Sequence, residues 1–161
     1  MIIILMGVSG AGKTVIGRLL AEALGWPFYD GDDFHPEANI KKMRSGIPLD
    51  DDDRDLWLAT LRRLIEQQLQ NGANAILACS ALKQRYRDRL QQGRPEEIRF
   101  VYLKGEFALI QQRLQERRDH FMNPNLLQSQ FETLEEPEGV LTVDVMQEPT
   151  VIVDLIKRGL S

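Results

Sequence analysis

Features typical of secreted and membrane proteins are scarce in this sequence. Cys79 is its single cysteine, so no disulfide can form within the chain, and we expect a reducing compartment. No apolar stretch approaches the roughly 20 residues that a membrane-spanning helix needs. The N-terminus lacks the basic segment and the small-residue cleavage site of a signal peptide. These absences predict a cytoplasmic protein with no membrane partner.

Excess positive charge and metal-binding patterns are also missing. The 24 acidic residues outnumber the 20 basic ones, for a net charge of −4, which argues against sequence-independent binding to nucleic acid. His35 and His120, the two histidines, have no partners at the spacing of a transition-metal site. The composition, 43% apolar and 27% charged, is that of a globular protein. We therefore expect one domain over residues 1–161.

A glycine-rich segment at residues 7–14, GVSGAGKT, matches the phosphate-loop pattern G-x-x-x-x-G-K-[ST] at every fixed position. It lies between a buried-strand run and a helical pattern, which is the context that the motif requires. In such a loop the backbone N–H groups and the helix dipole bind phosphate, the lysine reaches the β- and γ-phosphates, and the hydroxyl binds Mg²⁺. The alternative is a turn that binds nothing. We predict that ATP and Mg²⁺ are bound here, that Lys13 is catalytic and that Thr14 binds the metal. The predicted binding residues are Gly7, Val8, Ser9, Gly10, Ala11, Gly12, Lys13 and Thr14.

Hydrophobic periodicity alternates between strands and helices along the whole chain. Runs that are apolar throughout predict strands at 2–6, 28–30, 75–79, 99–104 and 140–144. Helical spacing predicts helices at 13–24, 36–45, 53–71 and 81–91, another from residue 107, and a closing one around 151–156. Such strands separated by helices indicate an α/β fold of three layers, with a five-stranded parallel sheet flanked by helices. Ligands of these sheets bind beyond the carboxyl ends of the strands.

Aspartates follow the second predicted strand, in the segment Asp30-Gly31-Asp32-Asp33. A phosphoryl-transfer enzyme needs a carboxylate that orients the acceptor hydroxyl and accepts its proton, and Mg²⁺ favours carboxylate oxygens. If the segment is extended, Asp30 and Asp32 lie on the same side of it, and Gly31 permits close approach by a substrate. We predict Asp32 as the base and Asp30 as the partner of the metal. The alternative is an acidic turn with no chemical role.

Basic residues near two predicted helix starts are candidates for substrate binding. The aspartates at 50–53 suit a helix N-terminus, but Arg54 opposes the helix dipole and could bind a substrate carboxylate or pair with its acidic neighbours. Lys83 and Arg87 share a helix face after the third strand, where a solvated basic face is the alternative. Ser80 suits the N-cap of that helix, and Cys79 is interpreted as core.

Arginines precede a polar stretch in the last third of the chain. Arg113 and Arg117 share a helix face, and a guanidinium can stack on adenine or neutralise the transferring phosphoryl group. The polar residues 118–130 are typical of a mobile lid, which we place at about 113–130. A charged helix end is the alternative.

Taken together, these segments resemble the small bacterial-type gluconokinases over nearly the whole chain. The phosphate loop is common to many unrelated proteins, but the combination is far more specific. The resemblance rests on GVSGAGKT at 7–14, DGDDFHP at 30–36, NIKKM at 39–43 with Gly46, PL at 48–49, DDR at 52–54 with WL at 57–58, CSALK at 79–83 with YR at 86–87, VYLKG at 101–105, Arg113 and Arg117 with HFM at 120–122, and SQFETLE at 129–135.

The resemblance implies transfer of phosphate from ATP to the 6-hydroxyl of D-gluconate, a shikimate-kinase-like fold with a mobile lid, and a homodimer. Carried onto this chain, it implies Asp32 and Arg117 as catalytic besides Lys13, and Arg113 and Arg117 as nucleotide contacts. Candidates for gluconate contacts are Asp32, His35, Arg54, Lys83 and Arg87. After the fifth strand, where the family pattern is Val-Asp-x-Asp-Gln-Pro, residues 144–149 read DVMQEP, which alters the loop on the adenine side.

Two other functions are consistent with the residues alone. One is a related small-molecule kinase acting on shikimate or a nucleoside monophosphate. The other is a nucleotide-binding module that transfers no phosphate, although the acidic segment and the arginines argue against it.

Overall fold

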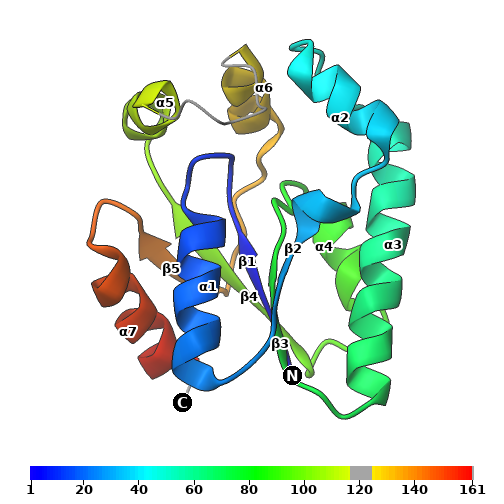
Figure 1. The fold of residues 1–161 in the computed structure, drawn as a ribbon, viewed down its shortest axis with the longest axis vertical. Coiled ribbons are helices and arrows are strands. Elements are labelled where there is room, and N and C mark those ends of the chain that lie inside the picture. Colours follow the sequence, from blue (N-terminus) through cyan, green and yellow to red (C-terminus); the bar gives the residue numbers. More distant parts are fainter. Residues whose placement is uncertain (117–124, 161) are drawn as a thin grey trace.

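A computed structural model describes residues 1–116 and 125–160 (Figure 1). Five parallel strands form one sheet in the order β2-β3-β1-β4-β5. This confirms the α/β fold with a five-stranded parallel sheet. The elements are β1 (Ile2–Met6), α1 (Lys13–Leu24), β2 (Phe28–Asp30), the 3₁₀ turn η1 (Gly31–Phe34), α2 (Glu37–Arg44), α3 (Asp51–Gln70), β3 (Ala75–Ala78), α4 (Gln84–Gln91), β4 (Ile98–Lys104), α5 (Phe107–Glu116), α6 (Asn125–Thr133), β5 (Leu141–Asp144) and α7 (Pro149–Leu160).

The sheet is covered on both faces, as Figure 1 shows, with α1 and α7 on one side and α3 and α4 on the other. Alternate residues of the central strand β1 divide between two cores. Ile3 and Leu5 pack in the core beneath α1 and α7, whereas Ile2 and Ile4 pack in the core beneath α3. Because both faces are buried, the strand is apolar throughout and does not alternate with polar residues.

The connections at the carboxyl ends of the strands all emerge at one edge of the sheet. The phosphate loop follows β1, η1 follows β2 and the segment 79–83 follows β3. Helices α2, α5 and α6 lie above this edge in Figure 1. The parallel topology thus brings the sequence-predicted motifs to one crevice, as expected for an open sheet of this kind.

Some element boundaries differ from the sequence-based expectation. Helix α3 begins two residues early, because Asp50 accepts a hydrogen bond from the Asp53 N–H while the Asp53 side chain accepts one from the Asp50 N–H. This confirms the capping interpretation of those acids. Helix α4 begins at Gln84, so Ser80 does not cap it. Residues 125–130, predicted as part of a polar lid, belong to a helix whose Leu126 and Leu127 are buried.

None of the helices in the described part of the chain is long and apolar enough to span a membrane.

Candidate active site

The phosphate loop is shaped by glycine and ends in an uncapped helix. Gly12 has a φ of +97°, a left-handed conformation that glycine adopts without strain, and helix α1 begins at the next residue. No side chain in the described part of the chain caps this helix, so its first N–H groups and its dipole face the crevice. Such a helix N-terminus binds anions. The local geometry is therefore the one expected of a phosphate-binding loop.

Lys13 and Thr14 lie where the motif places them. Lys13 Nζ donates hydrogen bonds to the carbonyl oxygens of Gly7 and Val8, at 2.8 and 2.9 Å, and so lies against the loop. Thr14 Oγ1 donates to Asp30 Oδ2 at 2.8 Å. A hydroxyl and a carboxylate oxygen in contact fit Mg²⁺, which takes one or two protein oxygens together with water and phosphate oxygens. The residues Thr14 and Asp30 thus suit the predicted metal site.

Asp30 and Asp32 are related differently from the extended arrangement that we expected. Residues 31–34 form a 3₁₀ turn, and Asp30 caps it by accepting a hydrogen bond from the Asp32 N–H at 3.0 Å. The expectation that Gly31 admits the substrate is also wrong. A Cβ on Gly31 would lie 2.5 Å from the carbonyl oxygen of Ala78, so the missing side chain permits contact between the turn and β3.

Asp32 projects from this turn with about half of its side chain exposed, at 53%. Desolvation by the surrounding crevice raises the pKa of the Asp32 carboxyl, while the positive charge of Lys13 acts in the opposite direction. The negative charges of Asp30 and Asp33 raise the pKa further. A carboxylate with a raised pKa that stays open to the crevice is a better proton acceptor than an isolated one.

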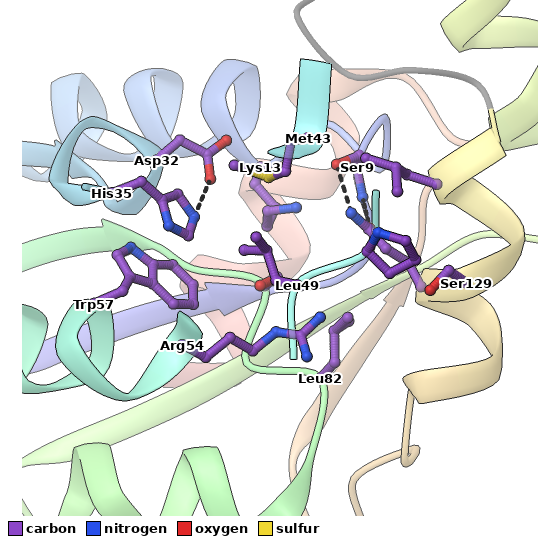
Figure 2. Close-up of a pocket in the computed structure, with 14 residues that line it drawn as sticks. Ser9, Lys13, Asp32, His35, Met43, Leu49, Arg54, Trp57, Leu82 and Ser129 are labelled. Carbon is purple, nitrogen blue, oxygen red and sulfur yellow. Dashed lines mark hydrogen bonds and ion pairs between the residues drawn. The ribbon is translucent and has the colours of Figure 1, made fainter. Parts of the chain in front are cut away.

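Three adjoining hollows follow the edge of the sheet. The central one is lined by Lys13, Thr14, Asp30 and Asp32 with the phosphate loop. A deeper pocket, part of which Figure 2 shows, shares Ser9, Lys13 and Asp32 with the central hollow. The residues that line this pocket are Ser9, Lys13, Asp32, His35, Met43, Pro48, Leu49, Arg54, Trp57, Ser80, Leu82, Leu126, Ser129 and Gln130.

The third hollow, on the other side of the phosphate loop, is largely apolar. It shares Gly10 and Gly12 with the central hollow and is otherwise lined mainly by Val15, Ile16, Val145 and Pro149. Arg113 lies at its wall and donates a hydrogen bond to the Val145 carbonyl at 2.6 Å. The altered segment after β5 therefore forms part of this wall. Arg117, the other predicted arginine, lies outside the described residues.

Among the basic candidates for substrate binding, Arg54 reaches the deeper pocket. Its guanidinium donates to the Tyr86 hydroxyl at 3.2 Å and lies 5.5 Å from the centre of that ring. The Tyr86 hydroxyl in turn donates to Asp51. Lys83 does not line the pocket, because its ammonium group extends toward Asp51, 3.5 Å from Oδ1. Arg54 is therefore held in place at the pocket by a neighbour, whereas Lys83 faces the acidic start of α3.

The structure corrects the expectation for Arg87. This residue is 2% exposed, and its guanidinium donates to the carbonyl oxygens of Ala81, Leu82 and Glu135 and to the Gln84 side chain. Ala81 has a φ of +45°, an uncommon conformation for a residue other than glycine. Arg87 therefore holds the segment after β3 in place, and it lines none of the three hollows.

Helix α6 contributes a wall that sequence reasoning missed. Leu126, Ser129 and Gln130 line the pocket. The Gln130 side chain accepts a hydrogen bond from the Ser9 N–H at 2.8 Å and donates to Ser9 Oγ at 3.2 Å. The segment SQFETLE contributes to the family resemblance, but nothing in its composition indicates a contact with the phosphate loop.

One edge of the sheet thus carries a glycine-rich loop before an uncapped helix, together with Lys13, the pair Thr14 and Asp30, and the exposed carboxylate of Asp32. These features and the family match define the class: the protein is a phosphate-loop phosphotransferase that acts on an alcohol group. Comparison with known proteins is more specific. Residues 9–141 match the sequence pattern of the family described as shikimate kinase.

Similar proteins cover almost the entire chain. The probable gluconokinase of Xenopus tropicalis is 44% identical, over 98% of this chain and 92% of its own length. The thermoresistant gluconokinase of Escherichia coli strain K12 is 43% identical, over 98% of this chain and 94% of its own length. The crystal structure of a gluconokinase from Sinorhizobium meliloti 1021 superposes with a TM-score of 0.87 at 45% identity, covering 98% of this chain and 90% of that one. The chain belongs to the gluconokinases of the shikimate kinase family.

Proposed function

We propose that this protein transfers the γ-phosphoryl group of ATP to the 6-hydroxyl of D-gluconate, giving 6-phospho-D-gluconate and ADP. The choice of gluconate as the substrate rests on the similarity to the gluconokinases named above. The observation that carries the proposal is the sharing of Ser9, Lys13 and Asp32 between the phosphate-loop hollow and the deeper pocket. A phosphate held in the first hollow and a hydroxyl held in the second would meet between Lys13 and Asp32, as in-line transfer requires.

On the nucleotide side, we assign the phosphates of ATP to the N–H groups of residues 7–14 and to Lys13. Mg²⁺ held by Thr14 and Asp30, directly or through water, would neutralise charge on the β- and γ-phosphates. The apolar hollow beside Arg113 is of the right kind for adenine, since a guanidinium and aliphatic side chains can pack on the base. We retain Arg117 as a catalytic residue and nucleotide contact on the strength of the family resemblance.

On the acceptor side, Asp32 would orient the gluconate hydroxyl and accept its proton. The hydroxyl oxygen then forms a bond to the γ-phosphorus, and the bond from that phosphorus to the β-γ bridging oxygen breaks, releasing ADP. Arg54 lines the same pocket and can bind the gluconate carboxylate through two parallel N–H···O bonds. An acidic protein thus recognises an anionic sugar through local positive charge. His35, which was also predicted as a gluconate contact, lines the same pocket.

We also propose that the protein is one domain over residues 1–161, has a lid at about 113–130, forms a homodimer and is cytoplasmic. The position of α5 and α6 above the crevice in Figure 1 supports the lid. Light scattering of the purified protein would test the dimer.

The experiment that tests the function is ADP release from Mg-ATP with D-gluconate, beside L-idonate, shikimate and AMP as rival acceptors. We expect strong and selective release with gluconate. Release with shikimate or AMP instead would reassign the substrate. Binding of ATP without acceptor-dependent release would indicate a module that transfers no phosphate.

A further inference from the structure

Two buried polar side chains lie outside the phosphate loop: His35, which faces Asp32, and its neighbour Asn39. The His35 side chain is 4% exposed, and Asn39 on α2 is 3% exposed. Burial of polar groups is costly unless they are hydrogen-bonded, so the direction of each hydrogen bond carries information about its role.

The Asn39 amide has its orientation fixed by the backbone of α3. Asn39 Nδ2 lies 2.9 Å from the carbonyl oxygen of Asp53 and 3.2 Å from Nδ1 of His35. A carbonyl oxygen can only accept, so the NH₂ group must face Asp53. Its second hydrogen is then available to His35 Nδ1, which must accept. The contact with Asp53 therefore determines which ring nitrogen of His35 carries no hydrogen.

The opposite ring nitrogen faces the catalytic carboxylate. Burial, and secondly the positive charge of Arg54, lower the pKa of His35 to about 4, so the imidazole is neutral at pH 7 and bears one N–H. With Nδ1 accepting from Asn39, this hydrogen lies on Nε2, the atom 3.8 Å from Asp32 Oδ1. Such a contact can shorten when the substrate binds.

The ring of His35 is also held in place on its face. It stacks on Trp57, with 4.2 Å between the ring centres and 15° between the planes, and Figure 2 shows it between Asp32 and Trp57. Trp57 Nε1 donates to the carbonyl oxygen of Gly31 at 2.7 Å, one residue before Asp32. Histidine, tryptophan and the turn that carries Asp32 thus form one packed unit.

We propose that His35 is a positioning residue for Asp32: Asn39 fixes the tautomer with hydrogen on Nε2, and this N–H directs the Asp32 carboxylate toward the acceptor hydroxyl. The inference rests on the proposed function for the reaction, but the tautomer does not depend on the identity of the substrate. Since His35 acts through Asp32, its loss should lower kcat and leave the KM values for ATP and gluconate nearly unchanged.

Two substitutions of His35 separate positioning from packing. His35→Gln keeps an N–H donor on a side chain of similar reach, whereas His35→Phe keeps the ring that stacks on Trp57 but has no donor. We expect His35→Phe to lose about tenfold in kcat, as is typical for the loss of an orienting partner, and His35→Gln to recover most of that loss. If packing were the whole role, Phe would be the better replacement, so equal or higher kcat in His35→Phe than in His35→Gln would overturn the proposal.

A double substitution tests whether the effect passes through Asp32. In an Asp32→Asn background, adding His35→Phe should lower kcat little further, because the carboxylate to be oriented is already absent. Full additivity of the two losses, or a rise in the gluconate KM of His35→Phe as the main effect, would instead make His35 a direct substrate contact.

The tautomer is measured separately by long-range ¹H–¹⁵N NMR, with His120→Gln used to assign the two histidines. We expect His35 to carry its hydrogen on Nε2 in the wild-type protein. In Asn39→Leu no side-chain N–H remains to donate to Nδ1, so the hydrogen should no longer be confined to Nε2. A wild-type hydrogen on Nδ1 would overturn the assignment. Wild-type protein that is inactive with gluconate would contradict the proposed function and leave the tautomer result intact.

Discussion

On the nucleotide side of the crevice most polar groups come from one contiguous segment, residues 7–14, whereas the acceptor side is assembled from η1, α2, α3, α6 and the segment after β3. The first side binds through backbone N–H groups and a helix N-terminus, which every phosphate loop shares. The second side uses side chains that are held by contacts with their neighbours. Arg54 donates a hydrogen bond to Tyr86, and His35 stacks on Trp57. Because the two sides use different residues, we expect that binding of ATP and selection of the acceptor can be changed separately.

Lys13→Ala should have the largest effect on turnover of any single substitution in the crevice. It removes the charge nearest to the transferring group on the nucleotide side, so we expect kcat to fall about 10³-fold in a folded protein. Steady-state ADP release and circular dichroism would check both points. Lys157→Ala, on the exposed last turn of α7, is the matched control and should behave like wild type. Turnover near normal in Lys13→Ala would remove the lysine from its assigned role.

Asp32→Asn should lower turnover by removing the proton acceptor on the acceptor side, without affecting the binding of ATP. An amide cannot accept the proton of the hydroxyl, so kcat should fall about 10²-fold or more, while calorimetry finds ATP binding unchanged. Asp33→Asn changes the neighbouring exposed carboxylate of the same turn and serves as the control. Equal effects of the two substitutions would mean that overall charge, and not Asp32 as a base, matters.

Arg54→Lys should weaken recognition of the acceptor and leave recognition of the nucleotide unchanged. Lysine keeps the charge but loses the fork that binds a carboxylate by two hydrogen bonds, and it loses the contact with the Tyr86 hydroxyl. We expect the KM for gluconate to rise about tenfold or more, as for loss of a charged hydrogen bond, with the KM for ATP unchanged. A parallel rise of both constants would place Arg54 outside the acceptor subsite.

Arg87→Met should change stability and not recognition. The substitution leaves the carbonyl oxygens of Ala81, Leu82 and Glu135 without their donor, so the free energy of unfolding should fall by about 2–3 kcal/mol. Urea titration measures this loss. An unchanged unfolding midpoint together with a raised gluconate KM would restore Arg87 as a substrate contact.

Acidification tests the acceptor side through the pH dependence of stability. Because burial and Arg54 lower the pKa of His35 to about 4 from an ordinary 6.5, the unfolded chain binds this proton more readily than the folded one. The contribution of neutral His35 to stability is complete above pH 6.5 and is lost as the pH falls toward 4. Within that window the slope should approach about 1.4 kcal/mol per pH unit.

His35→Gln removes this titration, so the difference between the two unfolding curves isolates the histidine from the carboxylates. The slope should be shallower in the variant between pH 6.5 and 4. Parallel curves for the two proteins would show that the pKa of His35 is not lowered.

The same division explains how much could be predicted from the sequence. The phosphate loop, the five parallel strands and the place of the acidic segment at the end of β2 could be predicted because each depends on a short contiguous pattern. The sequence left open whether residues 30–33 are extended or form a turn, because the close contact of Gly31 with β3 arises only when η1 packs on the sheet. The buried role of Arg87 was missed because its partners include Glu135, 48 residues away.

We propose that the acceptor pocket holds the carboxylate of a sugar acid at Arg54 and its terminal primary hydroxyl at Asp32. The most direct test is proton-coupled ³¹P NMR of the product formed from Mg-ATP and D-gluconate. A phosphate on C6 couples to two methylene protons, so we expect a triplet from a phosphate monoester. A doublet would place the phosphate on a secondary hydroxyl, and inorganic phosphate alone would mean that water is the acceptor. Either result would contradict the account.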